Sequence, residues 1–422
     1  MRKPFVLVPL LVLLLYPPDW TPRCVCAPAG SPAARTATVR VTNPADVTRH
    51  SETIAVSWDS LGRVLPALTN PPDEALYVTV FDGSAELPSQ VMTDPDAPGK
   101  KELLFQSDFG ARERKSFQVR LAPLESAPSR GSFASPVDAQ FVLPREDVAW
   151  ESDRIAFRIY GSVLAGNVDN GIDVWTKRVR SPIVGKWYKA DEGRISGKDY
   201  YHLDRGEGAD FFSVGRSLGA GGCAPWRNGK LYQPGLFTDH RILATGPVRA
   251  AFRVSYDKGT IDGVPFREVM TVSIDRGSNL SRIEVLYSGF PGIDTLTCFA
   301  GLVKRNGVTP AWGTTMRRGS STADGEVTAF CWAGLWGPTN DDPVNGSLGT
   351  GVVLAAPAAG RVGNDSTHFG LLITARRGSP LVYYAGAGWT RSGDFATEKD
   401  WSTYLETTAV LLKAPLRVEV AP

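Results

Sequence analysis

The chain has 422 residues, of which 42% are hydrophobic and 21% are charged. This composition is typical of a folded protein with an ample core, and it excludes a chain that is disordered throughout. The formal net charge is only +2 at pH 7, which argues against nucleic acid or an anionic membrane surface as the partner.

Residues 1–29 are typical of a secretory signal peptide. Arg2 and Lys3 precede an apolar run over residues 5–16, and Ala-Pro-Ala at residues 27–29 fits a cleavage site. The apolar run is too short to span a bilayer, so we expect no stable membrane anchor after cleavage. Cleavage removes three basic residues and one acidic residue, which leaves equal numbers of each. The sequence therefore predicts an exported protein, periplasmic or extracellular.

The rest of the chain consists of short segments rich in Val, Ile, Phe and Tyr, separated by Gly, Pro, Asn and Asp. About six such segments in residues 36–125 predict an N-terminal β-sandwich. A Ser/Pro-rich connector follows over residues 126–138, and the many strands expected over residues 140–422 predict two large sheets packed face to face. No stretch shows a convincing helical period over three turns, so the predicted fold class is all-β.

Three cysteines, Cys223, Cys298 and Cys331, remain after the leader, and their spacing matches no zinc site. A disulfide between Cys298 and Cys331 is one interpretation for an exported protein, although buried free thiols are favoured. The sequence has no dinucleotide or phosphate-loop fingerprint. We therefore expect neither a metal nor a cofactor.

Two neighbouring strands carry an unusual set of polar and aromatic side chains. Alternation over residues 154–160 places Arg154, Arg158 and Tyr160 on one face, and alternation over 172–177 places Trp175 and Lys177 together. Aromatic rings stack on sugars, and charged groups bind hydroxyls and carboxylates. We interpret this set as a ligand-binding face; the alternative is a polar rim whose tryptophan packs under a loop.

The next segments add further aromatic and ionisable residues. Trp187 and Tyr188 come first, and "DYYHLDRGEGADFFSVGRSLGAGG" over 199–222 then adds Tyr201, His202 and Glu207. We interpret this stretch as a loop of the site, with glycines that let the backbone approach a ligand closely. His202 is the preferred acid or base because histidine transfers protons near neutral pH, and a structural histidine is the alternative.

Two other features of the sequence bear on catalysis. The sequence "GRSLG" at 215–219 matches a nucleophile elbow, but no helix-forming segment follows it, so Ser217 is not expected to be a nucleophile. A pair of carboxylates for glycoside hydrolysis is available among Glu151, Asp173, Glu207 and Asp210, with separations that the sequence does not give.

Four blocks together carry a family resemblance: "FVLPREDVAWESDRIAFRIYG", "GIDVWTKRVRSPIVGKWY", "YYHLDRGEGADFFSVGRSLGAGG" and "GPVRAAFRVSYD". They resemble the exported bacterial proteins of domain-of-unknown-function family 4861, over nearly the whole mature chain. The block H-x-x-x-G-E-G-x-D is the most specific part. The resemblance implies a galactose-mutarotase-like β-supersandwich, an association with polysaccharide degradation, and a related activity that dehydrates an oligosaccharide. It transfers no catalytic residues, and a fold does not fix a reaction.

The leading hypothesis is a carbohydrate-active enzyme that acts on uronate-containing oligosaccharides or polysaccharides by elimination, as a lyase or dehydratase. Such a reaction needs a base, a cation that offsets developing charge, and an acid for the leaving oxygen. The alternatives are a glycoside hydrolase with paired carboxylates and a non-catalytic glycan-binding protein. The predicted catalytic residues are His202, Tyr201, Arg158 and Glu207, and the predicted substrate-binding residues are Arg154, Tyr160, Trp175, Lys177, Trp187 and Tyr188.

Overall fold

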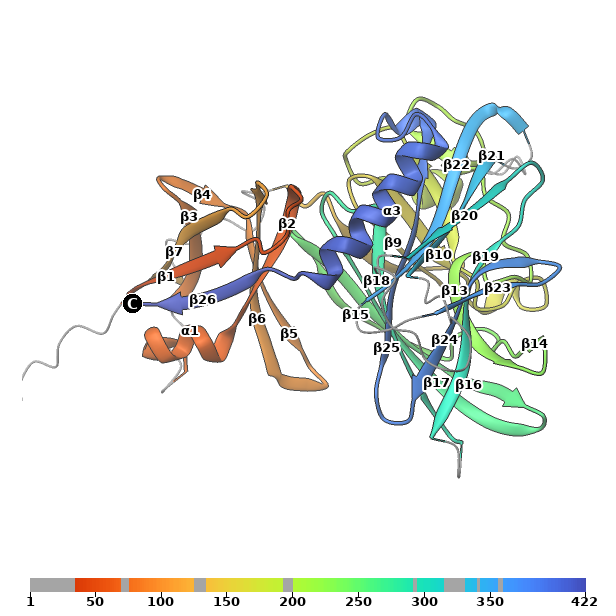
Figure 1. Cartoon of the computed structure of the whole chain (residues 1–422), viewed down its shortest axis with the longest axis horizontal. Coiled ribbons are helices and arrows are strands. Elements are labelled where there is room, and N and C mark those ends of the chain that lie inside the picture. The colour runs from red at the N-terminus through yellow and green to blue at the C-terminus, as the bar shows by residue number, and fades with distance from the viewer. Residues whose placement is uncertain are drawn as a thin grey trace, which may run out of the picture. The chain divides into compact units, whose positions relative to one another are not determined.

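The computed structural model describes residues 35–69, 76–124, 134–192, 200–290, 294–314, 331–339, 342–355 and 360–422. These residues form mainly antiparallel β-structure (Figure 1). The predicted all-β fold class is therefore confirmed. The predicted signal peptide lies outside the described residues, and the predicted connector is described only from residue 134.

The N-terminal strands pack around a core of their own, which includes Val39, Val80, Phe105 and Phe117. The helix α1 (Trp58–Val64) and the short helix η1 (Pro66–Leu68) pack against the same core. The strands of one sheet are, in order, β26 (Arg417–Ala421), β1 (Thr36–Thr42), β7 (Arg114–Pro123), β3 (Leu76–Asp82) and β4 (Ala85–Leu87), and those of the second are β2 (Arg49–Ser57), β6 (Ala97–Phe109) and β5 (Ser89–Asp94).

The last strand corrects a predicted boundary. β26 pairs antiparallel with β1, with Val420 opposite Val39, and Figure 1 shows the blue end of the chain beside the red first strand. Residues 417–421 thus belong to the N-terminal sheet, whereas the sequence analysis grouped them with residues 140–422. Val418 and Val420 alternate toward the N-terminal core, but alternation alone does not reveal a partner so distant in sequence.

The remaining strands share a second core that includes Trp150, Phe252, Cys298 and Tyr383. One sheet has the order β12 (Gly208–Asp210), β11 (Asp173–Lys177), β10 (Ile155–Ile159), β9 (Asp147–Glu151) and β8 (Asp138–Val142). Another has the order β14 (Lys230–Leu231), β13 (Ala220–Arg227), β19 (Thr295–Val303), β24 (His368–Arg376) and β23 (Arg361–Asn364). The third has the order β15 (Asp239–Thr245), β16 (Arg249–Ile261), β17 (Val264–Asp275), β18 (Leu280–Ser288), β25 (Leu381–Trp389), β22 (Asp342–Leu354), β21 (Trp332–Thr339) and β20 (Thr309–Gly313).

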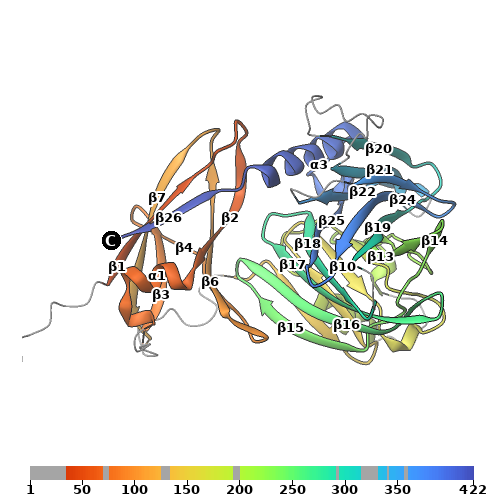
Figure 2. The same ribbon diagram turned by 60° about the horizontal axis from the view of Figure 1, so that its bottom comes forward.

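One helix contradicts the expectation that no stretch shows a helical period over three turns. The helix α3 (Glu398–Lys413) begins with a capping box at Thr397 and buries Trp401, Leu405 and Ala409, which are spaced four residues apart. Figures 1 and 2 both show it beside β20, β21 and β22, and the glycines of β21 and β22 leave room for its side chains. The helix α2 (Val184–Glu192) is shorter than three turns, and the short helices η3 (Ser162–Leu164), η4 (Tyr200–His202) and η5 (Thr390–Ser392) complete the described elements.

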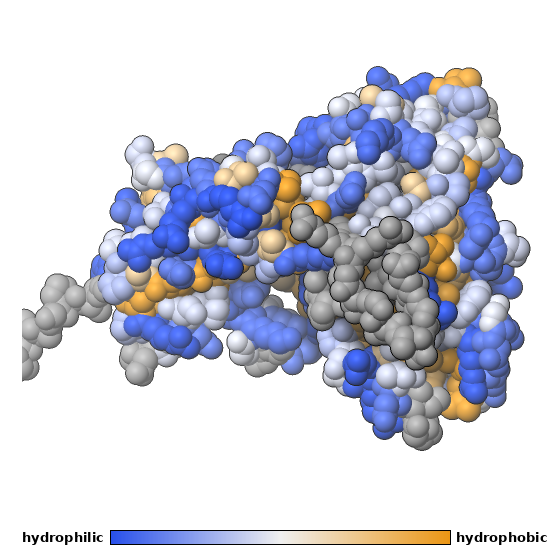
Figure 3. Space-filling view, in the orientation of Figure 1, coloured by the Kyte–Doolittle hydropathy of each residue, from blue (hydrophilic) through white to orange (hydrophobic). Residues whose placement is uncertain are grey.

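The surface and the thiols follow the usual pattern of a folded protein. Figure 3 shows a mostly hydrophilic face with hydrophobic residues in separate patches. In the part of the chain that the structure describes, Cys223, Cys298 and Cys331 are buried free thiols, which agrees with the favoured interpretation. No helix within these described ranges has the length and apolar character needed to cross a membrane.

Candidate functional site

The polar face predicted on β10 and β11 exists, but it is buried. Every residue of β9, β10 and β11 is buried. Phe157 and Val174 face the large core, whereas Ala156 and Trp175 lie in a second cluster with side chains of α2 and η4. The predicted alternation is therefore correct. The predicted ligand-binding surface is wrong, because α2 and η4 cover this side of the sheet.

The aromatic residues of this face pack on one another. Trp175 is fully buried, and its ring lies 4.8 Å from that of Tyr201, 5.0 Å from that of Tyr188 and 5.4 Å from that of Trp187. Trp187 and Tyr188 are each only 2% exposed. These positions contradict the predicted stacking of a sugar on Trp175, Trp187 or Tyr188, and they make the three rings part of the protein core.

Arg158 lies at the centre of a buried charge network. Its Nη2 atom is 2.5 Å from Asp173 Oδ2 and 3.0 Å from Asp210 Oδ2, and it also donates to the Tyr160 hydroxyl at 3.2 Å. Burial raises the pKa of Asp173 and raises that of Asp210 well above its usual range, against the opposing effect of the Arg158 charge. Burial therefore favours retention of a proton by this pair of carboxyls. The sequence predicted that Arg158 and Tyr160 lie on an open ligand-binding surface. Both side chains are buried instead.

Tyrosines extend the network. The Tyr188 hydroxyl donates to Asp147 Oδ2 at 2.8 Å. Burial raises the pKa of Tyr201 to about 12, although Arg158 and Arg145 act in the opposite direction. Tyr201 is thus a protonated phenol at neutral pH, and it is only 2% exposed.

His202 connects this network to the surface. Its side chain is 49% exposed, and its Nδ1 atom lies 3.3 Å from the main-chain oxygen of Asp210 and 3.7 Å from Asp210 Oδ2. Its ring centroid is 4.9 Å from that of Tyr201. The structure therefore brings the predicted residues His202, Tyr201 and Arg158 together, with His202 as the member that a solute can reach.

Arg145 is a further member of this group that the sequence analysis missed. Its guanidinium carbon lies 5.5 Å from the Tyr201 ring centroid, and it forms an ion pair with Asp191. The Arg145 side chain is 30% exposed, so it brings a partly exposed positive charge to the Tyr201 ring, which His202 also contacts. Arg145 lies in the turn before β9 and within the first of the four family-like blocks. This position is the sequence signal that could have identified it as a site residue.

Glu207 and Lys177 have structural partners. Glu207 accepts hydrogen bonds from Lys186 Nζ at 2.5 Å and from Trp187 Nε1 at 3.2 Å, and the Lys186 contact lowers its pKa. Lys177 is buried and contacts Glu151 Oε2 at 2.6 Å. Glu151 in turn accepts the main-chain N–H groups of residues 183 and 184. Both ion pairs thus hold α2 on the sheet, and burial contradicts the predicted substrate-binding role of Lys177.

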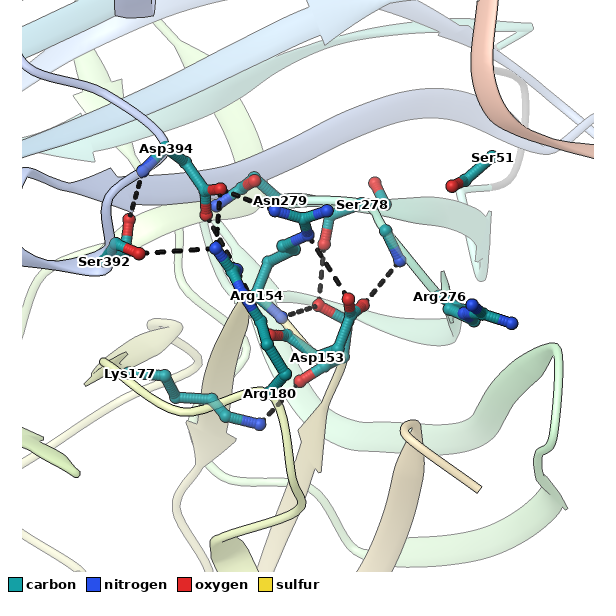
Figure 4. A network of polar contacts seen from close by, with 12 residues as sticks. Ser51, Asp153, Arg154, Lys177, Arg180, Arg276, Ser278, Asn279, Ser392 and Asp394 are labelled. Atoms are coloured by element: carbon teal, nitrogen blue, oxygen red, sulfur yellow. Dashed lines mark hydrogen bonds and ion pairs between the residues drawn. The ribbon is translucent and has the colours of Figure 1, made fainter. Parts of the chain in front are cut away.

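Arg154 belongs to a different cluster, shown in Figure 4. Its Nη1 atom lies 2.5 Å from Asp394 Oδ1 and its Nε atom 3.3 Å from Asp153 Oδ2. Arg180 binds the same Asp394 carboxylate through both of its terminal nitrogens, at 2.9 and 2.8 Å. The predicted grouping of Arg154 with Arg158 is therefore wrong, because Arg154 lies just before β10 and turns toward the segment after η5.

Three glycines of the stretch 199–222 have a packing role. Gly208, Gly219 and Gly221 have φ values of +116°, +62° and +114°. A Cβ atom would lie 1.9 Å from Thr176 O at Gly208, 2.1 Å from Ile172 O at Gly219 and 2.2 Å from Ala385 Cβ at Gly221. These three glycines allow close contact between protein segments and do not admit a ligand. At Gly206 and Gly215, by contrast, an added Cβ atom would meet nothing within 4 Å.

The end of this stretch is fixed by a buried histidine. His368 Nε2 accepts the Leu218 N–H at 3.0 Å, and its Nδ1 lies 3.2 Å from Asp365 Oδ2. The Ser217 hydroxyl is buried and donates to Val214 O at 2.6 Å. This geometry agrees with the expectation that Ser217 is not a nucleophile.

The fold and the site together define an all-β protein with a buried arginine–aspartate–tyrosine network that reaches the surface at one histidine. Residues 41–418 match the family described as "Domain of unknown function (DUF4861)", and the chain belongs to that family. It is 28% identical over 404 residues to "Uncharacterized protein P7" of Formosa agariphila, covering 90% of this chain and 93% of that protein.

Two solved structures from Enterococcus faecalis show a weaker likeness. They are an alpha-mannosidase from strain V583, with 9% identity and a TM-score of 0.43, and a protein in glycosyl hydrolase family 38, with 10% identity and a TM-score of 0.44. Each alignment covers 92% of this chain but only 46% and 47% of the respective structures. The chain thus spans less than half of their length, and likenesses at this level carry no argument about function.

Proposed function

We propose that the protein is an exported carbohydrate-active enzyme that acts on uronate-containing oligosaccharides by elimination, as a lyase or a dehydratase. The observation that supports this proposal best is the position of His202. It is half exposed, it lies against Asp210 of the buried network, and its ring contacts Tyr201, which Arg145 also contacts.

In this proposal His202 transfers the proton. It takes the proton from the carbon next to the sugar carboxylate, and a carbon–carbon double bond forms as the bond to the leaving oxygen breaks. The same histidine then returns the proton to the leaving oxygen, so that atoms and charge balance on one face of the sugar. Arg145 offsets the negative charge that develops near the carboxylate, while Tyr201 and Asp210 orient the imidazole.

The contacts of the acidic residues favour elimination over hydrolysis by paired carboxylates. Asp173 and Asp210 are buried and both bind Arg158, and Glu151 is buried against Lys177. Glu207 is partly exposed and binds Lys186. A hydrolase needs two carboxyl groups facing the scissile bond, and these four are committed to cations of the protein instead.

The test is turnover of a panel of uronate oligosaccharides by the mature protein, followed by absorbance of the new double bond and by product mass. We expect His202→Ala to lower turnover by about a hundredfold to ten-thousandfold with an unchanged melting temperature, since the side chain fills no core position. His202→Gln should be similarly inactive, because it retains hydrogen bonding but not proton transfer. The matched control is His50→Ala, at another exposed histidine.

Other outcomes select other functions. Products that gain water without a double bond indicate hydrolysis, and sugar binding without any product indicates a glycan-binding protein. Wild-type turnover by His202→Ala contradicts the proposed role of the histidine. Export is tested separately by fractionating cells and sequencing the N-terminus, which should begin near residue 30.

A further inference from the structure

We propose that Arg178 and Arg391 form a subsite that binds the carboxylate of an acidic sugar. Both guanidinium groups converge on one oxygen, with Arg178 Nη1 at 3.1 Å and Arg391 Nη1 at 3.7 Å from Asp204 Oδ2. Asp204 follows His202 by two residues, so the subsite lies on the segment that carries the proposed base. This inference rests on the proposed function, to which it adds the residues that recognise the anionic substituent.

The charge of this trio is unbalanced. The second oxygen of Asp204, Oδ1, accepts the N–H groups of Gly206 at 2.9 Å and Gly208 at 3.1 Å. One carboxylate thus faces two guanidinium groups, and within the trio one positive charge is not compensated. A carboxylate from a ligand would supply that charge, and guanidinium groups bind carboxylates through paired N–H donors.

The two arginines are accessible and held in place. Their side chains are 43% and 37% exposed for Arg178 and Arg391, against 10% for Asp204. The main-chain N–H of Arg178 donates to Glu207 O at 2.7 Å directly after β11. Arg391 lies in η5 and donates to the main-chain oxygen of Val344. Preorganised donors lose less conformational entropy when they bind an anion.

The neighbouring cluster of Arg154 and Arg180 supplies the matched control. Its two arginines, Arg154 and Arg180, pair with two carboxylates, Asp394 and Asp153 (Figure 4). Arg180 is 45% exposed, close to the value for Arg178. Accessible arginine is therefore present in both clusters, but the two arginines pair with two carboxylates in this cluster and with one carboxylate in the other.

The experiment measures binding by calorimetry, with the mature protein and two probes: a linear glucuronate tetrasaccharide and its carboxyl-reduced counterpart. We expect the wild type to prefer the charged probe by about tenfold or more. Arg178→Met and Arg391→Met should each remove most of this preference without changing affinity for the reduced probe. Arg180→Met should keep the preference, and Arg178→Lys should keep only part of it.

Failure of this inference is distinguishable from failure of the proposed function. If the wild type converts uronate oligosaccharides and both methionine variants keep the preference, the subsite is wrong while the enzyme assignment stands. If the variants lose the preference but the wild type forms no product, the subsite stands and the elimination proposal fails. A wild type with no preference for the charged probe overturns the subsite directly. If Arg178→Met folds poorly, the preference of Arg391→Met for the charged probe decides whether the subsite is correct.

Discussion

Two arginines, one on β10 and one directly after the neighbouring strand β11, have opposite environments. Arg158 lies on β10 with a side chain that is 5% exposed, and it contacts Asp173, Asp210 and Tyr160. Arg178 lies directly after β11 with a side chain that is 43% exposed, and it shares Asp204 with Arg391. The residue type is the same, so the covering elements α2 and η4 decide which arginine stabilises the core and which one can meet a ligand.

The energetic consequences differ in the same way. A buried ion pair contributes little net stability as a whole, but removal of one partner leaves the other charge buried without compensation. An exposed ion pair is screened by water and contributes less than about 1 kcal/mol. Substitutions in the buried network should therefore change folding, and substitutions in the exposed trio should change binding. The predictions below test that division.

The largest effect is expected from Arg158→Met. The substitution keeps much of the side-chain volume and leaves Asp173 and Asp210 without their cation, so we expect a loss of about 3–5 kcal/mol in the free energy of unfolding at pH 8. The folded-state pKa values of both carboxyls are already raised by burial, and loss of Arg158 raises them further. The native state then keeps protons that the unfolded state releases, so stability falls as pH rises through the folded-state pKa values.

The measurement is urea unfolding at pH 5 and pH 8, where the destabilisation should be smaller at pH 5. Arg178→Met is the control and should unfold like the wild type at both values. Equal unfolding free energies for Arg158→Met and the wild type would show that the buried network does not stabilise the fold.

Trp175→Leu tests the correction made to the predicted sugar platform. Trp175 is fully buried against Tyr201, Tyr188 and Trp187, so the smaller side chain leaves unfilled space. We expect a loss of about 2–3 kcal/mol in unfolding free energy, with an unchanged dissociation constant for the glucuronate tetrasaccharide. Weakened binding at unchanged stability is the contrary result, and it would restore the stacking role. Chemical unfolding and calorimetry on the same samples separate the two.

The sequence predicted the strands well because their alternation is a local property. It placed Arg158 and Trp175 on one face, which the structure confirms. It did not predict what covers that face. In α2, Val184, Trp187 and Tyr188 have helical spacing. The helix is nevertheless shorter than three turns, which is the length over which a helical period was sought in the sequence. A short amphipathic helix gains most of its stability from the surface on which it packs, and that surface is not visible locally.

The same limit explains what was missed in the candidate site. His202 and Tyr201 were identified from residue type and density, and the structure places them side by side. The shared carboxylate of Arg178 and Arg391 depends on contact between η5 and the segment after η4, which are far apart in the chain. No spacing rule relates these residues. The aromatic residues were assigned to the surface because sequence density does not distinguish a pocket wall from a packed interior.

Glu207→Gln should have the smallest effect on the free energy of unfolding. It tests a residue between the buried network of Arg158 and the exposed arginines. Glu207 binds the exposed Lys186 and the buried Trp187, and it is 25% exposed. The Lys186 contact lowers its pKa below the ordinary value of 4.5. Its stabilising contribution is thus fully present at neutral pH and is lost as pH falls through the folded-state pKa. Since the pair with Lys186 is partly solvated, we expect Glu207→Gln to lower the free energy of unfolding by less than about 1 kcal/mol at pH 7 and by less still near pH 3.

Lys186→Met is the control for this pair. It should give a similarly small loss, because it removes the other half of the pair. The melting temperatures of both variants at the two pH values provide the measurement. Wild-type turnover in Glu207→Gln would assign the glutamate to the attachment of α2, whereas a large loss of turnover at unchanged stability would extend the catalytic group from His202 to Glu207.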